Sequence, residues 1–246
     1  MRSTESLLET TISFVTSPAE RLRHRRAPRP IVFPVEEQVP ESKRHFKLRT
    51  ALYAILELAL GKSVVLGSDQ FVYWNARDPR RCLAPDVFVF VGRPDEDFKS
   101  WKSWERGGPP QLAIEIVSES DDEPIDSQGE SAGVLPARRP IRWSDKLERY
   151  HELGVRELVR FDADAEPGAR LQVWDRIDDD LVERAVEDDA TTCVTLGLDW
   201  VVAPLANYPL ALRLARGGVL LKTSDEARAD ADQRIAELEA ELASRR

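Results

Sequence analysis

The fold is decided by LAPDVFVFVG, residues 83–92, and PPQLAIEIVS, residues 109–118. Each stretch holds a short apolar run of β-favouring residues bounded by Pro or Gly, which is the pattern of a buried strand. Each run also carries one acid, since Asp86 follows Pro85 at the start of the first and Glu115 lies inside the second. A lone carboxylate in an apolar strand is costly unless a charge, hydrogen bonds or a metal compensates it. We therefore expect Asp86 and a divalent cation to face Glu115.

Length and composition indicate a globular protein. The 246 residues are 42% hydrophobic and 32% charged, which allows one large domain with a core of ordinary size. No run approaches the roughly 20 apolar residues that cross a bilayer, and residues 1–26 lack the apolar core of a secretory signal. We expect a cytoplasmic protein without membrane contact. Cys82 and Cys193 are too few and too far apart for a metal motif, and we expect them to remain thiols without a function.

Composition divides the chain into three parts. Residues 1–30 hold a cluster of arginines among prolines, which favours a flexible, solvated arm over the alternative of a phosphate-contacting arm. Residues 31–222 are expected to form the folded domain, in which the polar residues 119–142 form an acidic insertion loop. The net charge of −9 disfavours DNA binding unless acids are segregated in this way, because phosphate contacts come from Lys and Arg.

Two helices and a series of strands are predicted around the acids. The first helix covers residues 42–60, with Ser42 as N-cap, Gly61 at its end and one apolar face formed by Leu48, Leu52, Ile55, Leu56 and Ala59. The second begins near Ser144 as N-cap and ends at Gly154. Strand patterns cover residues 63–66, 70–74, 155–161, 171–177, 181–186 and 192–196, with Gly67 and Ser68 as a turn. This order predicts an α/β (α+β) fold, a mixed sheet flanked by helices.

The last part, residues 223–246, is predicted to be a charged helix. Its apolar residues recur at spacings of four, three and four, as the a/d seam of a coiled coil does: Ala231, Ile235, Leu238 and Leu242. A homodimer formed in part through this helix and a charged helix on a monomer are both open, because about two heptads are short for a stable coiled coil.

The chemistry expected at the acids is metal-assisted hydrolysis. Two carboxylates from neighbouring strands can hold Mg²⁺ or Mn²⁺, and such a metal orients water and neutralises charge on a phosphate. A lysine two residues beyond Glu115 would lie on the same face of the strand and add a positive charge, but Val117 occupies that position. Lys146, on the second predicted helix, could bring its ammonium into the same space, although most lysines are simply solvated.

Three motifs in order resemble the Uma family of putative restriction endonucleases, members of the PD-(D/E)xK nuclease superfamily. They are PDVFVF, AIEIVS and DKLERYHELGVREL, at residues 85–90, 113–118 and 145–158, and VPESKRHFKLRTALYAIL (39–56) and ADQRIAELEAELASRR (231–246) add to the likeness. The resemblance implies a restriction-endonuclease-like core and Mg²⁺- or Mn²⁺-dependent cleavage of DNA. It implies Asp86, Glu115 and the Ile116 carbonyl as metal ligands and Lys146 as the catalytic lysine, while His45, Glu41 and Tyr150 could complete the site.

Two other functions remain open at this point. The absent strand lysine, the net negative charge and the acidic insertion fit a catalytically weak or inactive nuclease-fold module that acts in protein or nucleic-acid interaction. The same metal ligands also fit a hydrolase of small phosphoesters, which the salt dependence of DNA affinity would distinguish from a DNA nuclease.

Overall fold

The computed structural model describes residues 42–117 and 142–245. The predicted N-terminal arm, Glu41 and residues 119–141 of the predicted acidic loop lie outside these residues. In chain order the helices and strands are α2 (Lys43–Leu60), η1 (Gly61–Ser63), β1 (Val64–Gly67), β2 (Val72–Tyr73), β3 (Cys82–Leu83), β4 (Val87–Val91), β5 (Trp101–Lys102), β6 (Leu112–Ile116), α3 (Trp143–Leu153), β7 (Glu157–Phe161), β8 (Leu171–Ile177), β9 (Asp180–Arg184), β10 (Ala190–Cys193), β11 (Leu198–Leu205), β12 (Tyr208–Arg216), β13 (Val219–Leu220) and α4 (Ser224–Ser244).

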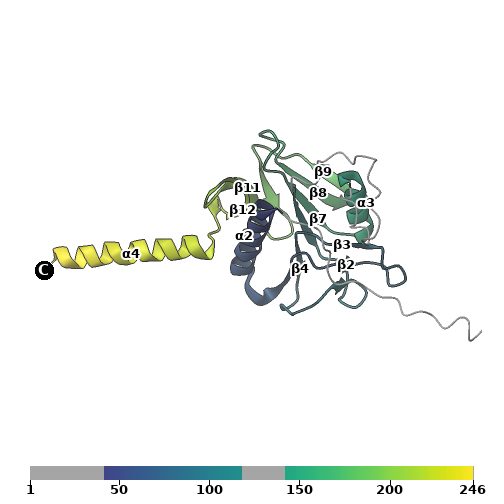
Figure 1. Ribbon diagram of the computed structural model, residues 1–246, viewed down its shortest axis with the longest axis horizontal. Coiled ribbons are helices and arrows are strands. Elements are labelled where there is room, and N and C mark those ends of the chain that lie inside the picture. Colours follow the sequence, from purple (N-terminus) through teal and green to yellow (C-terminus); the bar gives the residue numbers. More distant parts are fainter. Residues whose placement is uncertain (1–41, 118–141, 246) are drawn as a thin grey trace, which may run out of the picture. The chain divides into compact units, whose positions relative to one another are not determined.

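The largest sheet is mixed and has six strands in the order β1-β4-β6-β7-β8-β9 (Figure 1). Within it β6 and β7 run parallel, whereas the other neighbours are antiparallel. The two acid-bearing strands are antiparallel neighbours, with Val87 opposite Ile114. Two smaller sheets, β10-β11-β12-β13 and β3-β2-β5, complete the described domain. The predicted mixed sheet with helices is therefore confirmed.

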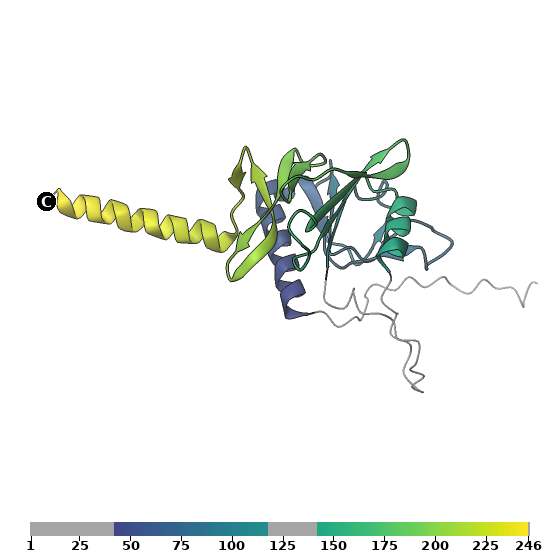
Figure 2. The same cartoon turned by 90° about the horizontal axis from the view of Figure 1, so that it is seen from above.

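The two faces of this sheet pack against different helices, and Figures 1 and 2 both show α2 and α3 on opposite sides of it. Leu112, Ile114 and Ile116 join one core with the apolar face of α2 and with the sheet β10–β13. Ala113 joins a second core with Tyr150 and other residues of α3. Side chains alternate between the faces of a strand, so Glu115 points to the same face as Ala113, toward α3.

The helix ends test the predicted caps. Ser42 caps α2, because its side chain accepts a hydrogen bond from the His45 N–H at 3.2 Å, and Gly61 is the C-cap. Gly154 ends α3 in the left-handed region at φ 87°. The predicted cap at Ser144 is wrong: α3 starts at Trp143, Arg142 is its N-cap, and the Ser144 hydroxyl lies by Asp145 at 3.5 Å rather than on a main-chain N–H.

Strand pairing departs from sequence order in two places. The runs around Gly67 and Ser68 form β1 and β2, but these two strands lie in different sheets and β1 pairs with β4. The region between residues 197 and 222, for which no strand was predicted, contains the long antiparallel pair β11 and β12. Its residues cover the outer side of α2 and close the first core.

The C-terminal helix α4 is confirmed as a helix and begins with a capping box between Thr223 and Glu226. The carboxylate of Glu226 also pairs with the buried Arg213 of β12 at 2.8 Å. From Ala227 onward every described residue of α4 is exposed. Among residues 42–117 and 142–245, no helix has the length and apolar character needed to cross a bilayer.

Candidate functional site

The acids meet where β4 begins and β6 ends. The register pairs Val87 with Ile114 and Phe88 with Ala113, so the next position places Asp86 opposite Glu115. Side chains that lie directly opposite in antiparallel strands have Cβ atoms about 4.5–5.5 Å apart. Both residues are buried, with 7% of Asp86 and 5% of Glu115 exposed. Two buried carboxylates therefore share one small volume.

Asp86 is held by two hydrogen bonds to the same oxygen. Its Oδ2 atom accepts from the main-chain N–H of Ile116 at 2.6 Å and lies 3.1 Å from Nε2 of His45. Because an ionised carboxylate only accepts, a hydrogen bond from His45 to it requires the proton on Nε2. No hydrogen bond from the residues that the structure describes reaches Oδ1 of Asp86. Oδ2 therefore fixes the Asp86 side chain, and Oδ1 can still accept a hydrogen bond or bind a cation.

Glu115 is contacted from α3 by two side chains one helical turn apart. Nζ of Lys146 donates to Oε2 at 3.0 Å, and the hydroxyl of the fully buried Tyr150 donates to Oε1. Positions i and i+4 share a helix face, which is why both reach the same carboxylate. Lys146 thus stands near the place that a lysine at Val117 would have occupied, while Val117 itself extends the pairing with β7 through its main-chain N–H.

Burial dominates the electrostatics of this cluster. It raises the pKa of Glu115 to about 7, and the nearby charge of Asp86 adds to the rise, although Lys146 and the hydrogen bond from Tyr150 act in the opposite direction. Burial and the adjacent Glu115 charge likewise raise the pKa of Tyr150, which keeps its hydroxyl a hydrogen-bond donor. A cation placed between the acids would favour their ionised forms.

The donor set fits a small, hard divalent cation. Mg²⁺ is usually held by one or two carboxylates and completes its shell with water and substrate phosphate. Asp86 and Glu115 supply two carboxylates, and the Ile116 carbonyl lies on the strand edge that faces Asp86, because N–H and C=O of one residue leave a strand on the same edge. Within the described stretches no three His, Cys, Asp or Glu side chains gather as a metal cluster, so main-chain or solvent oxygens would have to complete the shell.

Two residues that support the site were not predicted from the sequence. The hydroxyl of Ser68 donates to the main-chain carbonyl of Asp86 at 2.8 Å and accepts from the buried Arg49 at 2.7 Å. Arg49 lies four residues after His45 on α2, and this spacing is the one signal that could have placed both side chains on the face toward Asp86.

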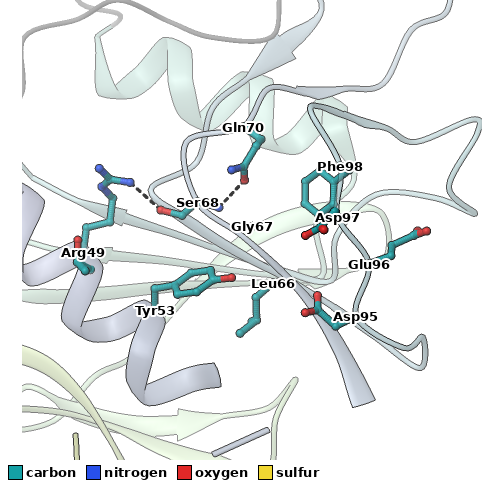
Figure 3. A pocket seen from close by; sticks show the side chains of 11 residues that line it. Arg49, Tyr53, Leu66, Gly67, Ser68, Gln70, Asp95, Glu96, Asp97 and Phe98 are labelled. Carbon is teal, nitrogen blue, oxygen red and sulfur yellow. Dashed lines mark hydrogen bonds between the residues drawn. The ribbon is translucent and has the colours of Figure 1, made fainter. Parts of the chain in front are cut away.

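A hollow of about 320 Å³ is lined in part by Ser68, the residue that bonds the Asp86 carbonyl (Figure 3). The Tyr53 hydroxyl and the Asp95 and Asp97 carboxylates turn toward its middle, and Arg49 stands at its edge. Burial and the charges of Glu57, Asp95 and Asp97 raise the pKa of Tyr53. The hollow is therefore lined by several acids, and Ser68 connects its wall to the main-chain carbonyl of Asp86.

The described domain is thus a mixed α/β fold in which two buried carboxylates and a lysine meet at one strand end. The chain belongs to the Uma2 family, described as putative restriction endonuclease, whose model matches residues 34–205. The resemblance noted in the sequence is thereby confirmed. Among solved structures, the chain is similar to a putative nuclease belonging to DUF820 from Anabaena variabilis ATCC 29413, with 11% identity, a TM-score of 0.38 and coverage of 70% of this chain and 77% of that chain. None of the curated proteins matches.

Proposed function

We propose that this protein is a divalent-metal-dependent endonuclease that hydrolyses DNA phosphodiester bonds. The observation that carries the proposal is the meeting of Asp86, Glu115 and Lys146 at the adjoining ends of β4 and β6. Membership of a family described as putative restriction endonuclease supports the same reaction and DNA as the substrate.

Asp86, Glu115 and the Ile116 carbonyl would hold Mg²⁺ or Mn²⁺. Bound there, the cation would orient a water molecule and neutralise charge on the scissile phosphate. His45 and the Ile116 N–H fix the Asp86 carboxylate, and Tyr150 fixes Glu115, so both acids are oriented before the substrate arrives. Lys146, 23% exposed at its side chain, keeps its ammonium beside Glu115 and can stabilise negative charge on the phosphate or move a proton.

The first turn of α2 is suited to face the DNA backbone. The start of α2 carries Lys43, Arg44 and Lys47 around His45, and its first turn has no acid. Lys43 and Lys47 are exposed, whereas Arg44 pairs with Asp164 at 3.0 Å. Helix N-termini and lysine side chains both attract phosphate. A local basic surface of this kind is compatible with a net charge of −9 for the whole chain.

Cleavage of supercoiled plasmid in Mg²⁺ or Mn²⁺ tests the proposal. Wild-type protein is expected to nick or linearise the plasmid, EDTA to stop the reaction, and Asp86→Asn to remove it. Asp189→Asn is the matched control, because Asp189 is a buried aspartate that bonds the main chain of Gly168 and Arg170 rather than the cluster. Equal cleavage by wild type and Asp86→Asn would overturn the proposed site.

An inactive nuclease-fold module is the second candidate, favoured by Val117 at the position of the strand lysine. It predicts no cleavage in either metal and no heat of Mn²⁺ binding that disappears in Glu115→Ala. The proposed endonuclease predicts cleavage in these metals and a heat of Mn²⁺ binding that is lost in Glu115→Ala.

A further inference from the structure

The C-terminal helix α4 presents an apolar stripe with no cover in the described chain. Ile235, Leu238 and Leu242 are 55%, 43% and 63% exposed, and Ala231 extends the stripe by one turn. The first two turns of α4 are tied to the rest of the described chain by the capping box, the Arg213–Glu226 pair and an ion pair between Lys222 and Asp230. Exposed apolar side chains aligned along one helix face mark a surface that a partner covers.

We propose that a second copy of this chain covers the stripe and forms a parallel two-stranded coiled coil with it. The spacing puts Ala231 and Leu238 at d positions and Ile235 and Leu242 at a positions of a heptad. A β-branched residue at a with leucine at d favours two parallel strands, and Ile235 followed by Leu238 meets that description. The proposal is independent of nuclease activity.

The charges beside the stripe select the parallel direction. In a parallel pair, residue g of one helix meets residue e of the next heptad on the other, which brings Arg234 to the partner's Glu239 twice. In an antiparallel pair the e residues meet each other, so Asp232 would face the partner's Glu239 and repel it, cancelling the attraction between Arg234 and Glu241. Arg234 now pairs with Glu237 on its own helix at 3.2 Å, an exposed contact that is easily exchanged.

The oligomeric state of the full chain tests the proposal by light scattering and sedimentation over a range of concentrations. Wild type is expected to have twice the 27.8 kDa mass of one chain, and Leu238→Asp is expected to be a monomer. Ala240→Asp is the matched control, because it adds the same charge at the f position, away from the seam, and should remain dimeric. A monomeric wild type, a dimeric Leu238→Asp or a monomeric Ala240→Asp would each overturn the proposal.

Disulfide formation tests the direction of the two helices. Leu242→Cys places a thiol at an a position, so a parallel pair brings the two thiols together, and oxidation should join the chains. In the antiparallel arrangement position 242 faces position 231, about 16 Å along the helix from the other thiol, and no bond could form. Wild type serves as the control, since Cys82 and Cys193 are buried. Dimers that stay uncrosslinked would overturn the parallel arrangement.

Discussion

Glu115 and Glu157 are both buried glutamates on the parallel neighbours β6 and β7, yet their surroundings differ. Glu157 is fully buried and receives four donors: Arg184 Nη2 at 3.1 Å, the Val194 N–H at 3.3 Å, the Thr195 N–H at 2.8 Å and the Cys193 thiol at 3.6 Å. Glu115 receives two donors from α3 and faces a second acid, Asp86. A carboxylate saturated by protein donors holds the structure together, whereas an undercompensated pair can recruit a cation.

The thiol beside Glu157 illustrates the same contrast. Burial, with the Glu157 charge as a second cause, raises the pKa of Cys193, so the thiol stays protonated and serves as a donor. A second carboxylate, Asp175, lies opposite Glu157 across β7 and β8, but both acids pair with the same Arg184. The main-chain donors to Glu157 tie β7 to the segment after β10. The glutamate at the start of β7 is therefore a structural residue.

The largest expected effect is on cleavage by Glu115→Gln. Loss of a carboxylate ligand removes several kcal/mol of metal-derived stabilisation, so the DNA cleavage rate should fall on the order of a thousand-fold. The free energy of unfolding should change little, because Lys146 is 23% exposed at its side chain and water can solvate its ammonium when the charge of Glu115 is lost. Plasmid cleavage measures the rate, and urea unfolding measures the free energy of unfolding. A rate within about tenfold of wild type would contradict the catalytic role assigned to Glu115 in contrast to Glu157.

Glu157→Gln should show the opposite pattern. It leaves Arg184 without one of its buried partners and should lower the free energy of unfolding by about 2–4 kcal/mol. The cleavage rate per folded molecule should stay close to that of wild type. A variant that unfolds like wild type but no longer cleaves would show that Glu157, too, takes part in the chemistry.

Lys146→Met should have an intermediate effect. Met keeps most of the side-chain volume but removes the ammonium near Glu115, and one lost electrostatic donor reduces a rate by about 10²–10³-fold. Mn²⁺ binding, measured by calorimetry, should remain, since the acids are still present. Lys146→Arg, which keeps the positive charge, is expected to recover part of the rate, and equal losses in the two variants would argue against a role for the charge.

Tyr150→Phe should have a smaller effect. It removes one hydrogen bond to Glu115 without creating a cavity, and such a bond contributes about 1 kcal/mol, or roughly fivefold in rate. The expected change is in kcat rather than KM, because Tyr150 positions a ligand and is too deeply buried to touch substrate. A rise in KM alone would contradict this positioning role.

The smallest expected effect is on the stability of Glu226→Gln. Glu226 is a partly exposed carboxylate and can be compared with the buried Glu115 and Glu157. Burial tends to raise its pKa, but the Thr223 N–H and Arg213 outweigh burial and hold the pKa below the ordinary 4.5. An acid with a lowered pKa stabilises the fold above its unfolded pKa and loses this contribution as pH falls through the folded pKa. Glu226→Gln should therefore be less stable than wild type at pH 7, with the gap narrowing below pH 4.5. If urea unfolding gave the same difference in unfolding free energy at pH 7 and below pH 4.5, the pairing of Glu226 with Arg213 would be contradicted.

The sequence predicts the site's strands better than its surroundings. The apolar runs at β4 and β6 are unambiguous because Pro and Gly bound them, and α2 carries its cap, Ser42, within the pattern. Contacts such as His45 with Asp86 join residues 41 positions apart, and no local spacing encodes them. The strands β11 and β12 were not predicted, because Pro204 interrupts the apolar pattern of β11. The start of α3 was not predicted correctly, because its N-cap, Arg142, makes no side-chain capping hydrogen bond. Cytoplasmic location and the domain bounds stay predictions.

A crystal of wild-type protein soaked in Mn²⁺ tests the central claim most directly, because anomalous scattering locates the ion without reference to activity. The account predicts a peak bridging Asp86 and Glu115, with oxygen distances of about 2.0–2.6 Å and Lys146 beside Glu115. A saturating soak that leaves these two carboxylates without an ion, or that places the ion at another set of ligands, would contradict it.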